Sequence, residues 1–269
     1  MGMRALGSLR RVRHLNCGTF RARLGGPALV SHVVVCEFEH GLALIDSGLG
    51  TDDVAHANSR LGVGFRLLLP TLDPAEAAVT QLDAMGFSAA DVAHIVLTHM
   101  DLDHLGGAAD FPSATVHTSA VEQSSATTRT DAAAKVRYRA PQLRAVKNRT
   151  SGYSDFPDEL FGFAGHMVHD SVCAIPMPGH TAGHCAIAID DPQRGWLLHA
   201  GDAFHHRRAI TGQSSGRSIS MVETALADDR RQLRENQRRL ADLAARTAGP
   251  QIFCAHDPVQ FRALADSAR

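Results

Sequence analysis

Six residues, His99-Met-Asp-Leu-Asp-His104, constrain this chain more than any other part of its sequence. They directly follow an apolar run, 94–98, that is typical of a buried strand. His99 and Asp101 lie two residues apart, so in an extended segment their side chains point to the same side. Asp103 and His104 begin the next turn and point elsewhere. A capped helix start would explain Asp103 alone, so the cluster indicates a metal site at the end of a strand.

Three further segments place metal-type side chains directly after a predicted strand. They are His180 after 171–175, Asp202 after 196–199 and His256 after 251–254. One histidine after a strand is usually a packed or surface residue, but the same arrangement after four strands is hard to produce by chance. Histidine nitrogens and carboxylate oxygens are common ligands of divalent ions. The sequence therefore predicts a metal site assembled from four loops.

The rest of the chain alternates between strand and helix patterns. Strands are predicted at 28–38 and 42–45, joined by a hairpin turn at His40-Gly41, and at 114–118 and 185–189; helices are predicted at 75–85 and 222–245. This alternation indicates an α/β layered fold. Two stretches interrupt it, a loop-rich segment at 54–72 and an insertion at about 122–165 that we expect to cover the core.

Composition excludes several classes of partner. The 27 basic and 28 acidic residues among 269 give a net charge of −1, which argues against a nucleic-acid or anionic-membrane binder. The sequence contains neither the continuous apolar core of a signal peptide nor about 20 apolar residues that could span a membrane. Its five dispersed cysteines never form a CxxC pair, which favours small buried thiols and a cytoplasmic location.

The four loops, together with Asp46-Ser47-Gly48, resemble the metallo-β-lactamase superfamily of hydrolases. The resemblance extends from Asp46 to His256-Asp257. It implies a four-layer αβ/βα sandwich of two mixed sheets, with metals held by loops at one edge, and a single domain over 1–269 with the insertion near the mouth of the active site. The likeness is greatest to the N-acyl-homoserine-lactone lactonase branch and smaller to glyoxalase II-type thioesterases.

The resemblance also implies a role for each motif residue. Two divalent ions are expected, most often zinc. The implied ligands are His99, Asp101 and His180 for the first ion, Asp103, His104 and His256 for the second, and Asp202 as a bridge, with Asp46 orienting the site without ligating. His184 is expected to support its loop, and His94, His117 and His199 are expected to have packing roles.

Two positions depart from the family pattern. The family motif is His-x-His-x-Asp-His, and Asp101 stands at its second histidine. A carboxylate binds zinc at about 2.0–2.2 Å, so Asp101 is expected to remain a ligand and to shift preference toward manganese or iron; the alternative is that it has left the site and one metal remains. His205 stands where the lactonase branch has a tyrosine that contacts the substrate carbonyl. Either its imidazole takes over this catalytic contact, or His205 and His206 are surface residues.

The predicted mechanism is that of a dinuclear metal hydrolase. Two ions can bind a bridging water and lower its pKa, so that hydroxide attacks a lactone or other carboxylic ester. Asp103 is expected to pass a proton to the leaving group. The alternatives are a thioesterase and a non-catalytic ligand-binding relative, while the arginines of the insertion leave nuclease activity open. The expected partner is a small-molecule substrate bound by a monomer or homodimer, with Tyr138 and Phe161 of the insertion at its mouth.

Overall fold

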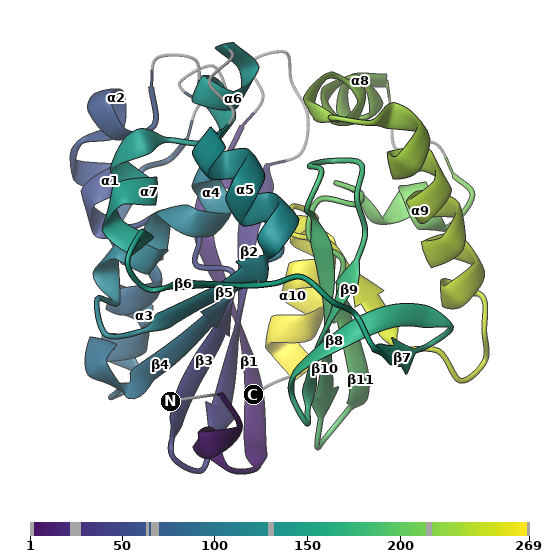
Figure 1. Ribbon diagram of the computed structural model, residues 1–269, viewed down its shortest axis with the longest axis horizontal. Coiled ribbons are helices and arrows are strands. Elements are labelled where there is room, and N and C mark those ends of the chain that lie inside the picture. Colours follow the sequence, from purple (N-terminus) through teal and green to yellow (C-terminus); the bar gives the residue numbers. More distant parts are fainter. Residues whose placement is uncertain are drawn as a thin grey trace.

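A computed structural model describes residues 3–21, 28–62, 65, 70–128, 132–213 and 217–267. In this part of the chain the strands form two six-stranded sheets, ordered β1-β2-β3-β4-β5-β6 and β12-β11-β10-β9-β8-β7 (Figure 1). The first sheet contains β1 (Leu9–Phe20), β2 (Leu29–Phe38), β3 (Gly41–Ile45), β4 (Val92–Val96), β5 (Thr115–Ser119) and β6 (Thr150–Tyr153). The second contains β7 (Asp158–Leu160), β8 (Phe163–His169), β9 (Val172–Pro176), β10 (Cys185–Asp191), β11 (Gly195–His199) and β12 (Gln251–Phe253).

Helices cover the outer faces of the two sheets, with α3 and α7 beside the first and α9 beside the second (Figure 1). The helices are α1 (Thr51–Ala55), α2 (Ala57–Arg60), α3 (Ala78–Ala84), α4 (Leu102–Leu105), α5 (Ala120–Thr128), α6 (Ala132–Arg137), α7 (Ala140–Val146), α8 (Arg217–Leu226), α9 (Arg230–Ala244) and α10 (Pro258–Ser267). Among the residues described, no helix has the length and apolar character needed to span a membrane.

Strand side chains alternate between two apolar cores, as the period of two in a strand requires. In β2, Val33 and Val35 pack against the outer helices, whereas Val34 and Cys36 pack between the two sheets. Strand β10 does the same on the other side, since Ile187 faces the opposite sheet and the alanines beside it face α9. Both sheets are thus buried on both faces, and the expected four-layer αβ/βα sandwich is confirmed.

Parallel pairing places several loops at one edge of the sandwich. Strands β3, β4, β5 and β6 run parallel to one another, and β11 runs parallel to β12, while the remaining neighbours are antiparallel. The carboxyl ends of parallel strands meet at the same sheet edge, so the loops that follow β3 and β4, and those that follow β11 and β12, lie close together. These loops carry most of the predicted ligands.

Several predicted elements differ from those observed. The hairpin at His40-Gly41 is confirmed by β2 and β3. The long helix predicted at 222–245 is wrong as a single element, because the chain breaks between α8 and α9 and Asp229 caps the second helix by accepting bonds from two backbone N–H groups. Strand β1 and helix α10 were not predicted.

The insertion at 122–165 has two parts with different surroundings. Helix α6 lies beyond the end of the first sheet that bears the loops, whereas α7 packs against its outer face (Figure 1). The segment that follows is not a cover, because it supplies β6 to the first sheet and β7 to the second. Phe161 lies in the turn after β7 and packs on Trp196. Part of the other interruption, residues 63–64 and 66–69, lies outside the described residues.

Candidate metal centre

The predicted ligands meet at one end of the two sheets. His99 and Asp101 lie in the loop after β4, and Asp103 and His104 lie on the short helix α4 that begins at Leu102. The other three side chains come from the second sheet, which supplies them from the loops after three different strands: His180 after β9, Asp202 after β11 and His256 after β12. Seven side chains from four separate segments of the chain are thereby brought together, as the pattern of strands and loops predicts.

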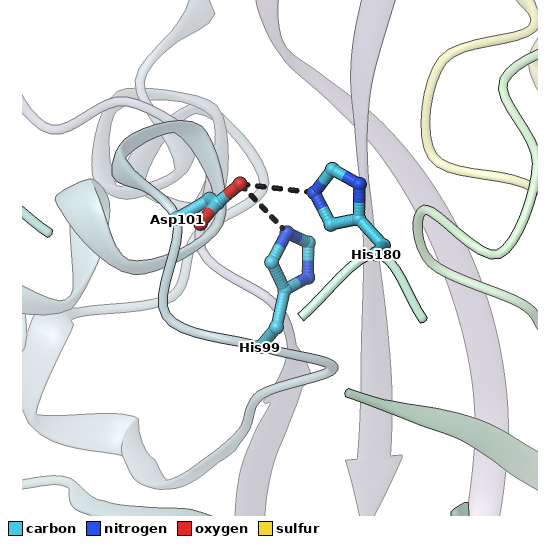
Figure 2. A group of neighbouring side chains, drawn as sticks. All are labelled: His99, Asp101 and His180. Atoms are coloured by element: carbon cyan, nitrogen blue, oxygen red, sulfur yellow. Dashed lines mark hydrogen bonds and ion pairs between the residues drawn. The ribbon is translucent and has the colours of Figure 1, made fainter. Parts of the chain in front are cut away.

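Three side chains form the first half of the centre (Figure 2). The Asp101 Oδ2 atom lies 3.0 Å from His180 Nε2 and 3.4 Å from His99 Nε2. Both rings are buried, and their nitrogens converge on the same carboxylate oxygen. The Asp101 carboxylate therefore faces the two histidines with which it is predicted to bind an ion, and its role as a ligand stays a prediction.

The second half is built around Asp202. Its carboxylate lies 3.0 Å from His256 Nε2 and 3.4 Å from His104 Nε2, while Asp103 approaches those two rings to within 3.9 and 4.0 Å. The other Asp202 oxygen lies 3.4 Å from His180 Nε2 and 3.8 Å from His99 Nε2. Asp202 thus faces both halves at once, which is the position that a bridging ligand requires.

The donor set of the centre fits divalent metal ions. Its ligand atoms form overlapping clusters, each spanning at most 4.8 Å. Several buried atoms of the centre have no hydrogen-bond partner among the described residues: His99 Nε2, His104 Nε2, Asp101 Oδ1 and Asp202 Oδ1. A buried polar atom without a partner is costly, and imidazole nitrogens with carboxylate oxygens are suitable ligands for zinc and for harder divalent ions. Metal ions would satisfy these atoms together.

Charge in the centre points the same way. Burial opposes protonation of His104, yet the carboxylates of Asp202, Asp46 and Asp103 raise the pKa of its ring well above the ordinary value. For His180 the effect of burial is the larger one, and it lowers the pKa to about 4 against the pull of Asp202 and Asp101. His180 is therefore neutral, as a ligand must be, and the carboxylates that favour a proton on His104 would equally favour a divalent cation in place of that proton.

Hydrogen bonds from the scaffold orient three of the four rings. His104 donates from Nδ1 to Asp46 at 2.8 Å, and His256 donates from Nδ1 to the Val30 carbonyl at 2.8 Å. His99 Nδ1 lies 3.0 Å from the Thr98 hydroxyl. Bonds of this kind fix the ring so that Nε2 points into the centre. Asp46 belongs to none of the candidate ligand clusters of the described residues and bonds to the His104 ring, in agreement with the orienting role expected for it.

Asp46 has an unusual backbone that its side chain explains. Its φ is +58°, a left-handed conformation that non-glycine residues seldom adopt. The conformation aims the carboxylate at the Thr98 backbone N–H, 2.8 Å away, and at His104. Burial opposes ionisation of Asp46, but His104 outweighs it and lowers the pKa of the carboxyl. The strain is thus retained where it holds a ligand in place.

His184 supports the loop and does not face the centre with a free nitrogen. It donates from Nδ1 to the Met177 carbonyl and accepts at Nε2 from the Asp202 backbone N–H, 3.0 Å away. Gly201 must be glycine here, because a Cβ would lie 2.6 Å from His184 Nε2 and its φ is +51°. The expected supporting role of His184 agrees with these contacts.

His205 is a buried neighbour of the centre and not a surface residue. Only 4 % of it is exposed, its Nε2 lies 3.3 Å from Asp202 and its Nδ1 lies 3.4 Å from Glu223. Burial opposes protonation, but Asp202 and then Glu223 raise the pKa of the ring to about 10. Because both nitrogens face carboxylates, the geometry favours His205 as a group that holds Asp202. Its contact with a substrate carbonyl stays a prediction.

Arg137 of the insertion reaches the centre, where the sequence did not predict a contact, and its neighbour Tyr138, expected at the mouth, lies beside the ligand loops. Arg137 Nη1 lies 3.2 Å from Asp101 Oδ2. Burial opposes ionisation of Asp101, but Arg137 and then His99 hold the pKa of its carboxyl well below its usual value. Tyr138 donates to buried Glu122, which also accepts bonds from Met100 N–H and the Thr181 hydroxyl beside the ligand loops. An arginine-rich segment gives no signal that singles out one such arginine.

Comparison with known proteins places the chain in a family. A model of the Metallo-beta-lactamase superfamily matches residues 26–256. A probable metallo-hydrolase of Mycobacterium tuberculosis is 39 % identical over 268 residues, covering 96 % of this chain and 84 % of the relative. The chain belongs to the metallo-β-lactamase superfamily. The predicted resemblance is therefore confirmed, and with it the expectation of a metal-dependent hydrolase.

More distant relatives include lactonases. The N-acyl homoserine lactonase AttM of Azorhizobium caulinodans is 27 % identical over 219 residues, covering 81 % of this chain and 78 % of the relative. The solved structure of an N-acyl homoserine lactone hydrolase, with the product N-hexanoyl-L-homoserine at its catalytic metal centre, has a TM-score of 0.71 at 19 % identity. It covers 95 % of this chain and 96 % of its own, and at this identity the likeness concerns the fold.

Proposed function

We propose that this protein is a hydrolase that opens a lactone or another carboxylic ester at a centre of two divalent metal ions. The observation that carries the proposal is the position of Asp202 between two sets of side chains, each with two buried histidines and one half-buried aspartate. The named activity of the AttM relatives supports a lactone as the substrate class. The protein, a single hydrolase domain that is a monomer or a homodimer, would act on a small-molecule substrate.

Each half of the centre would hold one ion. The first would be held by His99, Asp101 and His180, the second by Asp103, His104 and His256, and both by Asp202. When bound, such a pair of ions lowers the pKa of a water toward neutrality and polarises a carbonyl group. Zinc suits the nitrogen ligands, and the extra carboxylate of Asp101 extends the preference toward manganese or iron.

The protein's own groups would then orient and transfer protons. Asp103 is one of the more exposed groups of the centre, with 18 % of its side chain accessible, so it can reach both solvent and substrate. We assign to it the transfer of a proton from the attacking water to the leaving alkoxide. Asp46 and Thr98 hold the rings of His104 and His99, and the helical part of the insertion, with Arg137 and Tyr138, borders the centre.

The test measures metal content and reaction class together. Purified protein is analysed for metals, treated with a chelator, reconstituted with zinc, manganese or iron, and assayed on lactones, carboxylic esters and thioesters. We expect about two ions per chain, loss of hydrolysis on chelation, recovery on reconstitution, and preference for lactones or esters. A preference for thioesters would support the thioesterase alternative, and absence of turnover would support a ligand-binding relative. Full activity in metal-free protein would overturn the proposal.

A further inference from the structure

Arg137 is a largely buried cation at the first half of the centre. It is the last residue of α6, and only 10 % of its side chain is exposed. Its Nη2 donates to the carbonyl of Leu226, the last residue of α8, so the guanidinium is tethered between two helices. Its Nη1 lies 3.2 Å from Asp101 and makes no hydrogen bond of good geometry. The side chain is therefore held between two helices with its Nη1 beside the Asp101 carboxylate.

The contacts of Asp101 explain what this cation faces. A single oxygen, Oδ2, has three nitrogen neighbours, from His180 at 3.0 Å, Arg137 at 3.2 Å and His99 at 3.4 Å. Two of these belong to the candidate ligand set, and the third is the only permanent positive charge among them. Asp101 places a negative charge where a histidine would be neutral, and Arg137 brings one positive charge beside it.

We propose that Asp101 and Arg137 form one charge-paired unit, in which Arg137 is a positioning residue for the first metal ion. Arg137 holds the carboxylate toward His99 and His180 and offsets its charge, so that the pair carries the same net charge as a neutral histidine. This inference rests on the proposed metal centre. Partners that orient a metal ligand typically change metal affinity by 10–100-fold, so the pair is expected to act through affinity.

The effect of Arg137 on metal affinity should depend on which residue stands at position 101. Beside Asp101, the guanidinium orients a ligand, so its removal weakens metal binding. Beside a histidine at the same position, the guanidinium would have no carboxylate to pair with and would repel the nearby cation. The effect of removing Arg137 should therefore change sign when Asp101 is replaced by histidine. A role in folding alone would give the same effect in both backgrounds.

Arg139 offers a matched control in the same insertion. Its Nε donates to the Arg60 carbonyl and its Nη1 to the Lys135 carbonyl, so it stabilises local structure through backbone groups. Replacing it removes an arginine of similar surroundings without touching Asp101.

The experiment is a double-mutant cycle of Asp101→His with Arg137→Met, read by metal affinity and not by activity. Zinc and manganese affinities are measured by competition with a chelating dye, and stoichiometry by elemental analysis. We expect Arg137→Met to weaken one of two ions by about 10–100-fold in the native background and to leave that ion unchanged or more tightly bound in the Asp101→His background. Arg137→Lys should retain part of the affinity, and Arg139→Met should change it in neither background.

Three results would overturn the inference. The first is an equal loss of metal affinity in both backgrounds, and the second is no change of affinity in the native background. The third is a native protein that binds one ion and gains a second when Arg137 is removed, because the guanidinium would then occupy the place of that ion. If Arg137→Met does not fold, Arg137→Lys and Arg137→Gln are compared in the same cycle. A native protein that binds no metal at all would instead refute the proposed metal centre.

Discussion

Four buried histidines near the ends of the strands, His104, His256, His184 and His199, use their ring nitrogens in two different ways. At the candidate centre, His104 and His256 each give Nδ1 to the scaffold and turn Nε2 toward Asp202. In contrast, His184 and His199 have both nitrogens bonded to the backbone, His199 through the His32 carbonyl and the Gly201 N–H. A metal ligand needs a free lone pair. Of these four rings, only those of His104 and His256 have a nitrogen that is not bonded to the backbone.

This difference teaches why motif spacing alone does not identify a ligand. His180 and His184 lie on one loop, four residues apart, and both are buried. His180 faces Asp101 and Asp202, whereas His184 fastens Met177 to the Asp202 backbone. The assignment depends on hydrogen-bond partners that come from other strands. The following experiments separate side chains that would bind metal from those that stabilise the fold.

The largest effect is expected at the shared ligand. Asp202→Ala should remove the carboxylate that faces both halves, so both ions should bind more weakly and turnover should fall by at least about 10²–10³-fold. Metal content and hydrolysis rate are measured on the same preparation. Asp191→Ala is the control, because Asp191, the last residue of β10, is also buried but forms an ion pair with Arg194 away from the centre. Two tightly bound ions in the Asp202 variant would contradict the bridging role.

A loss confined to one half is expected at Asp101. Asp101→Ala removes one ligand of the first ion and leaves the second with Asp103, His104 and His256. Metal content should fall from two ions to one, and activity should collapse, because polarisation of the carbonyl needs the first ion. Asp101→His should keep two ions and shift preference toward zinc. An alanine variant with two tightly bound ions would show that Asp101 is a spectator.

A smaller effect distinguishes the two histidines of the loop. His180→Gln should reduce binding of the first ion and change the unfolding free energy of metal-free protein little. His184→Gln should lower that free energy by about 1–3 kcal/mol, because the Met177 carbonyl and the Asp202 N–H lose buried partners. Both are measured by chemical denaturation in the presence of a chelator. If the His184 variant unfolds like the native protein, its supporting role is wrong.

The sequence was most informative where local signals and fold agree. Strands followed by ligand-type residues are visible as short apolar runs, so the positions of His99, His180, Asp202 and His256 could be predicted. The break at Asp229 could not, because the apolar spacing continues across it. Strand β1 was missed because it is rich in arginine at its exposed positions, and Arg137 was missed because its contact with Asp101 depends on how α6 packs.

The smallest effect concerns histidines that lie away from the centre, in the first sheet. His94 and His117 bond to each other, with 2.9 Å between Nδ1 and Nε2. Burial, aided by His94, lowers the pKa of His117 from 6.5 to about 4. The unfolded chain therefore takes up a proton near pH 6.5 that the folded chain takes up only near pH 4. The stability from this group is complete above pH 6.5 and is lost as the pH falls toward 4.

His117→Gln removes the group that titrates and should flatten this part of the stability profile. Unfolding free energies of native protein and variant are compared at intervals from pH 7.5 to pH 4 with a chelator present, so that metal release does not contribute. His40→Gln, at the exposed hairpin turn, is the control and should leave the slope unchanged. Parallel profiles for the native protein and the His117 variant would mean that the pair bears a proton in the folded state. The His94–His117 pair would then differ from the histidines of the centre only in which groups their rings contact.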